Sequence, residues 1–224
     1  MILKMEDVMK KYDTVLFDLD GTLLDTSKGV VMAIEYTIKQ MNLEPLPLET
    51  MLSFIGPPIK VSIKKTFNLS DAETNKALEI WRDYYGSTAI FEAEVYDGII
   101  ETLEMLKNKE IKIGVATYKK EDFAVKVLNH FGIGKYFDQI SGADGYGKLT
   151  KSDVIKNCLT ALNVTDLGTV LMVGDSDNDS KGAKEIGVDF VGVTYGFGFK
   201  TEDDLKSFPY VGCISTPTLL EQYI

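Results

Sequence analysis

The sequence has few of the residue types that many catalytic and structural sites need. It has 224 residues but only one histidine, one arginine and two cysteines. With a single histidine, His130, near the end of a predicted helix, chemistry that needs a histidine base is poorly supported. Cys158 and Cys213 form neither a dense disulfide framework nor a Cys/His metal motif, and we expect both to be buried thiols.

Long apolar runs are also missing, and the charge is strongly one-sided. No stretch approaches the roughly 20 apolar residues of a membrane-spanning helix, and residues 1–11 are charged rather than signal-like. The formal net charge of −10 disfavours nucleic acid, which is bound by clustered lysine and arginine. We therefore expect a cytoplasmic protein, a monomer or weak homodimer, with neither a membrane nor a nucleic acid as partner.

Two kinds of hydrophobic pattern divide the chain. Residues 14–17 and several later segments read as short strands, and helical patterns separate the later ones. An uninterrupted apolar run such as 14–17 is typical of a strand buried on both faces. The alternation predicts an α/β fold with a doubly wound, Rossmann-like parallel sheet. The predicted strands after residue 95 are 111–116, 137–141, 170–173 and 190–193; the helices between them are 98–107, 123–131, 152–162 and 179–186.

Residues 25–94 have a different pattern from the rest of the chain. Helical periodicity covers 30–41, 59–67 and 71–85, and Pro45, Pro47 and the Gly56-Pro57-Pro58 turn separate these segments. We predict an inserted helical cap domain over residues 25–94. The core domain is then discontinuous and consists of residues 1–24 and 95–224.

Two aspartates follow the first predicted strand directly. Open parallel sheets bind ligands beyond the carboxyl ends of their strands, which is where Asp18 lies. Side chains at positions i and i+2 project to the same side of an extended chain, so Asp18 and Asp20 converge unless something holds them apart. Convergent carboxylates favour Mg²⁺, and Gly21 permits a sharp turn after them. The alternative is an exposed Asp-Gly turn.

Further polar residues follow two later predicted strands. Thr117 ends the strand at 111–116, where its hydroxyl could hold an anion or instead cap the next helix. Lys151 lies in the first turn of a helix whose start is marked by a Thr150–Asp153 capping box. A lysine at that position opposes the helix dipole, so it favours an anionic partner. Lys148 is the alternative lysine for this site.

Two segments look like known ion or nucleotide motifs but fail them. Residues 142–149 nearly form a nucleotide-binding P-loop, yet Leu149 replaces the Ser or Thr that binds magnesium. Residues 174–179 are rich in carboxylates, but Ser180 and Ile186 stand where an EF-hand loop needs glycine and glutamate. A magnesium site that combines Asp175 with Asp18 is the better interpretation, and Asp177 is expected to face solvent or cap a helix.

These motifs together resemble the haloacid dehalogenase superfamily, in particular its phosphoglycolate phosphatase and 5′-nucleotidase branches. The signature Asp18-Leu19-Asp20-Gly21-Thr22-Leu23 is followed in order by Thr117, Lys151 and the motif Gly174-Asp175…Asp179. The resemblance implies hydrolysis of a small-molecule phosphate monoester through an aspartyl-phosphate on Asp18. Asp20 then acts as general acid and base, and Thr117 and Lys151 hold the phosphoryl group.

The resemblance also implies a Mg²⁺ cofactor. It assigns the metal to Asp18, the main-chain carbonyl of Asp20 and Asp175, with Asp179 in support. Two positions depart from the family pattern. Tyr118 replaces a frequent asparagine and is a candidate for substrate contact, and Ser152 replaces the proline that follows the lysine in phosphoglycolate phosphatase relatives.

The cap is expected to select the substrate. Its candidate contacts are the loop around Gly56, which could instead be an ordinary turn, and Arg82, which could instead form a local ion pair or face solvent. Two other functions remain open: a sugar phosphomutase of the β-phosphoglucomutase type, and a non-catalytic phosphometabolite sensor. Dehalogenation is less well supported, because it needs neither the magnesium carboxylates nor Asp20.

Overall fold

The computed structural model describes residues 11–145 and 147–224 and contains a six-stranded sheet with strand order β5-β4-β1-β6-β7-β8. Every pair of neighbouring strands is parallel, as the sequence predicted. The fold class is therefore confirmed as α/β. The strands are β1 (Thr14–Phe17), β4 (Lys112–Lys120), β5 (Gln139–Ala143), β6 (Val170–Gly174), β7 (Asp189–Val193) and β8 (Gly212–Ile214).

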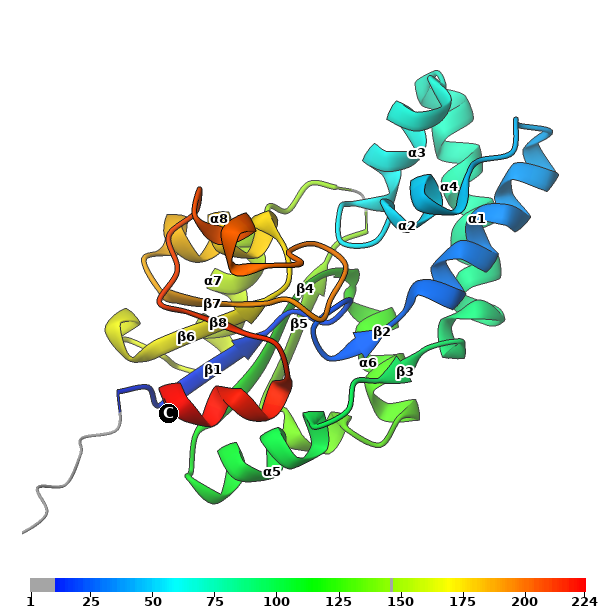
Figure 1. The fold of residues 1–224 in the computed structure, drawn as a ribbon. Helices are drawn as coiled ribbons and strands as arrows, with labels where there is room; N and C mark the ends of the chain where they lie inside the picture. Colours follow the sequence, from blue (N-terminus) through cyan, green and yellow to red (C-terminus); the bar gives the residue numbers. More distant parts are fainter. Residues whose placement is uncertain (1–10, 146) are drawn as a thin grey trace, which may run out of the picture.

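Helices cover both faces of the sheet (Figure 1). Helices α5 (Ile99–Asn108) and α6 (Glu121–His130) and the C-terminal 3-10 helix η4 (Pro217–Tyr223) pack on one face. Helices α7 (Lys151–Ala161), α8 (Asp177–Ile186) and α9 (Glu202–Leu205) pack on the other. Successive side chains of β1 alternate between two hydrophobic clusters, with Val15 and Phe17 in one and Leu16 in the second. This explains why the strand has no polar alternation.

Four helices lie beyond the carboxyl ends of the strands (Figure 1). They are α1 (Ser27–Met41), α2 (Leu48–Leu52), α3 (Ile59–Phe67) and α4 (Asp71–Ser87). Asn42 ends α1 in the left-handed conformation, and a Ser70–Glu73 capping box begins α4. The chain enters and leaves this helical segment through the antiparallel pair β2 (Leu24–Asp25) and β3 (Glu94–Val95), so its two ends lie side by side.

Some sequence predictions need correction. The strand expected at 137–141 begins two residues later, because the 3-10 helix η2 (Gly134–Tyr136) precedes it and the Asp138 carboxylate accepts the backbone N–H of Ile113. Strand β8 was not predicted, because three residues carry too short a pattern to recognise. Cys158 is buried as expected, but Cys213 lies on this edge strand and is only half-buried.

The single histidine lies at the end of a helix, as the sequence predicted. His130 is the last residue of α6 and stacks on Phe91, with 4.1 Å between ring centroids. Across residues 11–145 and 147–224, every helix is too short or too polar to cross a bilayer. Residues 1–10 of the charged N-terminal segment, and Tyr146 of the P-loop-like segment, lie outside the described residues.

Candidate active site

The site begins at the turn after β1. Asp18 directly follows the strand, and its backbone N–H donates to the carbonyl of Val173 on β6 at 2.9 Å. Gly21 has a φ of +83°, and a Cβ at this position would lie 2.3 Å from Oδ2 of Asp175. Only glycine satisfies both the left-handed backbone and the close approach. The turn therefore brings the Asp18 segment against the loop after β6.

Three buried carboxylates meet at this edge of the sheet. Asp18, Asp175 and Asp179 are 5%, 2% and 0% exposed, and each offers an oxygen within 4.8 Å of the others. They come together because β1 and β6 are adjacent parallel strands, and α8 begins just after β6. Asp175 is further oriented by the backbone N–H groups of Phe197 and Gly198, which donate to its Oδ2 at 2.6 and 3.0 Å.

One lysine faces this cluster. Lys151 is the first residue of α7 and is 3% exposed, and its Nζ lies 2.8 Å from Asp18 Oδ1 and 2.6 Å from Asp179 Oδ1. Lys148, the other candidate, is exposed on the preceding loop. The Thr150–Asp153 capping box is present as predicted and fixes where the helix begins. The local capping signal thus correctly located a lysine whose partners are far away in the sequence.

The electrostatics of the cluster are unbalanced. Burial raises the pKa of Asp18 to about 6 and that of Asp175 to about 7, and the nearby Asp179 carboxylate adds to both shifts. Burial alone would lower the pKa of Lys151, but Asp179 and Asp18 outweigh it and raise the pKa. Among the described residues, one ammonium faces three carboxyl groups, so the cluster carries a net charge of −2 when all three are ionised. Carboxylate oxygens in this arrangement fit Mg²⁺, a hard divalent cation.

Thr117 lies in the same edge of the sheet, on the neighbouring strand β4. Its side chain is 1% exposed, and its Oγ1 accepts the backbone N–H of Lys119 at 3.1 Å. The hydroxyl proton therefore remains available to donate to an anion. The alternative interpretation, in which Thr117 caps the next helix, is wrong, because α6 begins only at Glu121 and its N-cap residue is Lys120.

Asp20 does not join the acidic cluster. Its two carboxylate oxygens lie 2.8 and 3.0 Å from Nζ of Lys119, and the Thr26 hydroxyl donates to Oδ1 at 2.8 Å. The Lys119 side chain is only 6% exposed, and its ammonium also lies 4.9 Å from the centroid of the Tyr85 ring on α4. Burial alone would lower the pKa of Lys119, but Asp20 and Tyr85 raise it. Sequence reasoning missed Lys119, because a Tyr-Lys-Lys segment is typical of an exposed strand end.

Asp179 and Asp177 take different roles at the start of α8. Asp179 Oδ2 accepts the backbone N–H and the hydroxyl of Ser176 at 3.0 and 2.7 Å, which forms a capping box. Its other oxygen, Oδ1, is the one that contacts Lys151. Asp177 is half-exposed and pairs with Lys181 four residues later at 2.5 Å. The expectation that Asp177 faces solvent is confirmed.

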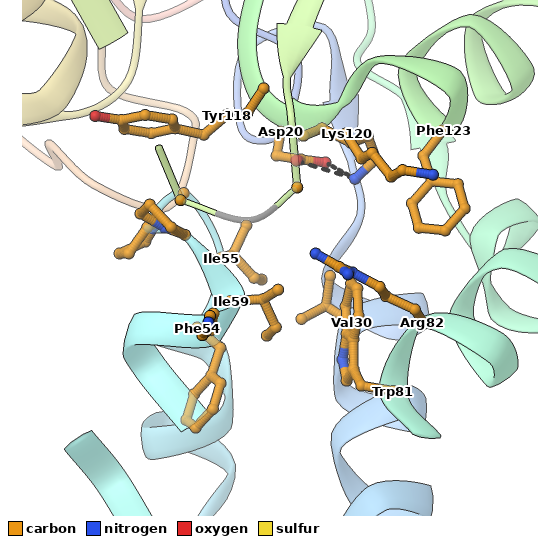
Figure 2. Close-up of a pocket in the computed structure, with 18 of the residues that line it drawn as sticks. Asp20, Val30, Phe54, Ile55, Ile59, Trp81, Arg82, Tyr118, Lys120 and Phe123 are labelled. Carbon is orange, nitrogen blue, oxygen red and sulfur yellow. Dashed lines mark hydrogen bonds and ion pairs between the residues drawn. The ribbon is translucent and has the colours of Figure 1, made fainter. Parts of the chain in front are cut away.

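A cavity lies between the helical segment and the carboxyl edge of the sheet, lined by residues of α1, α3, α4 and the loop before α3 (Figure 2). Most of its lining is aliphatic or aromatic. Arg82 on α4 points into it, and Gly56, with a φ of +96°, lines it in the loop before α3. Both predicted cap residues therefore lie at the cavity, and Asp20 lies at its sheet side. The lining side chains include Val30, Phe54, Ile55, Trp81, Tyr118 and Phe123, together with Lys60, Lys119 and Lys120.

A parallel α/β sheet that gathers three carboxylates and a lysine at its carboxyl edge has the architecture of a haloacid dehalogenase-type hydrolase. A family model described as haloacid dehalogenase-like hydrolase matches residues 15–193. The chain belongs to this family, as its motifs indicated. The match includes β4, β6, β7 and all but the first residue of β1, together with Asp18, Asp20, Thr117, Lys151, Asp175 and Asp179.

Several relatives are similar along most of the chain. A 5′-nucleotidase of Pseudomonas aeruginosa is 33% identical over 204 residues, which cover 91% of each protein. A phosphoglycolate phosphatase of Aquifex aeolicus is 33% identical over 77% of this chain and 80% of its own length. Among solved structures, a predicted phosphatase from Clostridium acetobutylicum superposes with a TM-score of 0.87 at 35% identity, covering 94% of this chain and 97% of that one.

The charge imbalance generates a prediction about stability. Mg²⁺ that binds only the folded state at about 100 times its Kd adds about 2.7 kcal/mol, so Tm should rise by about 5–10 °C. We expect Asp175→Asn to abolish most of this rise, because it removes one of the three charges. Thermal denaturation with Mg²⁺ and with EDTA measures the effect. Asp177→Asn is the matched control, and an equal loss in that variant would contradict the assignment.

Proposed function

We propose that this protein is a Mg²⁺-dependent phosphatase that hydrolyses a small-molecule phosphate monoester through an aspartyl-phosphate on Asp18. The observation that carries the proposal is the buried Lys151 ammonium 2.8 Å from the Asp18 carboxylate, at the rim of an acidic cluster in a member of a hydrolase family. The names of its relatives, phosphatases and a nucleotidase, support a phosphate ester as substrate.

In the first step, an oxygen of Asp18 attacks phosphorus, a phosphorus–oxygen bond forms, and the bond to the leaving alcohol breaks. A carboxylate needs no base for this attack, which agrees with the scarcity of histidine. The difficulty is repulsion between the carboxylate and an anionic phosphate. Lys151 and the Thr117 hydroxyl absorb part of this charge, which is the main contribution of proteins to phosphoryl transfer. Asp18, Asp175 and the main-chain carbonyl of Asp20, with Asp179 in support, would hold Mg²⁺, which would supply further charge neutralisation.

We propose that Asp20 is the general acid and base of the reaction. For the first step the Asp20 carboxyl must carry a proton in place of its ion pair with Lys119; it donates that proton to the leaving oxygen, and then takes one from the water that attacks the aspartyl-phosphate. The side chain lies at the cavity, on the side from which the leaving alcohol must approach. Lys119 and Thr26 orient it. Phosphate is then released, and Asp18 returns to its starting state.

We propose that residues 25–94 form a cap that covers the site, excludes water during the attack and selects the alcohol. The aliphatic and aromatic lining favours an alcohol with substantial apolar surface. Nucleosides meet this requirement better than glycolate, which has two carbons. A positively charged Arg82 in the same cavity favours a substrate with a further anionic group, and this keeps phosphoglycolate as a second candidate.

A panel of phosphate esters tests the proposed reaction. We expect phosphate release from at least one of phosphoglycolate, nucleoside monophosphates and hexose phosphates with Mg²⁺, and loss of release with EDTA. The assay measures free phosphate together with the sugar products by NMR. Isomerisation of a hexose phosphate without net phosphate release would instead identify a phosphomutase. Ligand binding without turnover across the panel would identify a sensor.

Asp18→Asn tests the covalent intermediate. The amide has no negative charge and is a poor nucleophile, so we expect turnover to fall by at least about 10³-fold and the phosphoenzyme to disappear. Acid quenching followed by intact-protein mass spectrometry detects the phosphoryl group on the protein. Asp177→Asn, the control, should retain both turnover and the phosphoenzyme. Substantial phosphatase activity in purified Asp18→Asn would rule out the assignment.

Arg82→Gln tests the substrate contact in the cap. The variant keeps a polar side chain but shortens it and removes its charge. With an anionic substrate, we expect KM to rise by about 10- to 100-fold, the range for the loss of a hydrogen bond to a charged group, with kcat changing less than 2-fold. Steady-state kinetics on the best substrate of the panel measures both constants, and Lys206→Gln on the exposed surface is the control. A fall in kcat at unchanged KM would contradict this role.

A further inference from the structure

Tyr118 contacts both the backbone N–H and the side-chain ammonium of Lys151. The Tyr118 hydroxyl accepts the backbone N–H of Lys151 at 2.9 Å, and the Lys151 ammonium lies 5.7 Å from the centroid of the Tyr118 ring. Tyr118 directly follows Thr117 at the end of β4, and Lys151 begins α7, 33 residues further along the chain. The tyrosine therefore joins two elements that both contribute to the phosphate site.

The backbone contact closes a gap in the hydrogen bonding of α7. The first N–H groups of a helix have no partner within the helix, and at this end the Thr150 side chain accepts the backbone N–H of Asp153, two residues beyond Lys151. The Tyr118 hydroxyl takes the N–H of Lys151. This bond fixes the Cα of Lys151 relative to the end of β4, where Thr117 lies.

The position of that Cα matters, because the lysine ammonium must meet both Asp18 and Asp179. The side chain is buried, and its two ion pairs measure 2.8 and 2.6 Å. A displacement of about 1 Å in such a site can cost as much as 10²-fold in rate. An ammonium over an aromatic ring is also favourable, by about 0.5–2 kcal/mol depending on how far it is desolvated.

We propose that Tyr118 is a positioning residue for Lys151, and this inference rests on the proposed function. Its hydroxyl holds the start of α7, and its ring borders both the lysine ammonium and the substrate cavity. Figure 2 shows the ring at the edge of the cavity with its hydroxyl directed away from Arg82 and Trp81. One side chain therefore contacts the space for the leaving alcohol and also sets the position of the phosphate-binding lysine.

The two parts of the side chain can be separated by mutation. Tyr118→Phe keeps the ring and removes the hydroxyl, so we expect kcat to fall by about 3- to 10-fold with KM unchanged. Binding of orthovanadate, a phosphate mimic that needs no turnover, should weaken by a similar factor in calorimetry. Tyr118→Leu also removes the ring, so KM should rise in addition. In Tyr118→Phe, the Lys151 amide should exchange with solvent faster.

Tyr136→Phe is the matched control, because it removes a tyrosine hydroxyl that bonds to Glu104 at 3.0 Å on the surface, outside the site. It should leave kcat and vanadate affinity unchanged. If Tyr118→Phe keeps wild-type kcat and vanadate affinity while the wild-type protein is active and binds vanadate, the positioning role is wrong and the proposed function stands. If the wild-type protein neither binds vanadate nor releases phosphate from any ester, the proposed function and this inference both fail.

Discussion

The structure depends above all on holding three buried carboxylates beside one lysine. Isolated charges are costly to bury, so such a cluster persists only where the surrounding fold fixes every member. Asp18 and Asp175 end adjacent strands of a sheet whose register is set by core packing on both faces. The stability of the whole domain therefore offsets this cost. The remaining negative charge makes the edge suitable for a divalent cation, whereas Lys151 favours an anionic ester.

Helix starts complete the arrangement. Thr150–Asp153 and Ser176–Asp179 capping boxes fix the first turns of α7 and α8, and each of these helices carries one charged residue of the site. Asp179 has both functions, because one of its carboxylate oxygens caps α8 while the other contacts Lys151. The residues that stabilise the helix ends are thus also the residues that set the geometry of the charges.

The positions of the main charged residues of the site could be predicted from local sequence patterns. The apolar run of β1 located Asp18, and a capping box located Lys151, because both signals span only a few residues. The contacts of Asp20 with Lys119 and of Tyr118 with Lys151 join residues 99 and 33 positions apart, and no local pattern encodes them. Strand β8 was missed for a related reason, since its three residues form a strand only by pairing with β7.

The separation of Asp18 from Asp20 follows from the same long-range contacts. In an extended strand, these two side chains would converge, but Gly21 turns the chain and Lys119 and Thr26 hold the Asp20 carboxylate away from the acidic cluster. Each of the two aspartates forms an ion pair with a different lysine, Asp18 with Lys151 and Asp20 with Lys119. Carboxylates in different surroundings can take different chemical roles, and here one lies among metal-type ligands while the other borders the cavity. Thr117, Tyr118 and Lys119 are consecutive at the end of β4. Tyr118 contacts Lys151 and Lys119 contacts Asp20, so this one segment reaches both lysine–aspartate pairs.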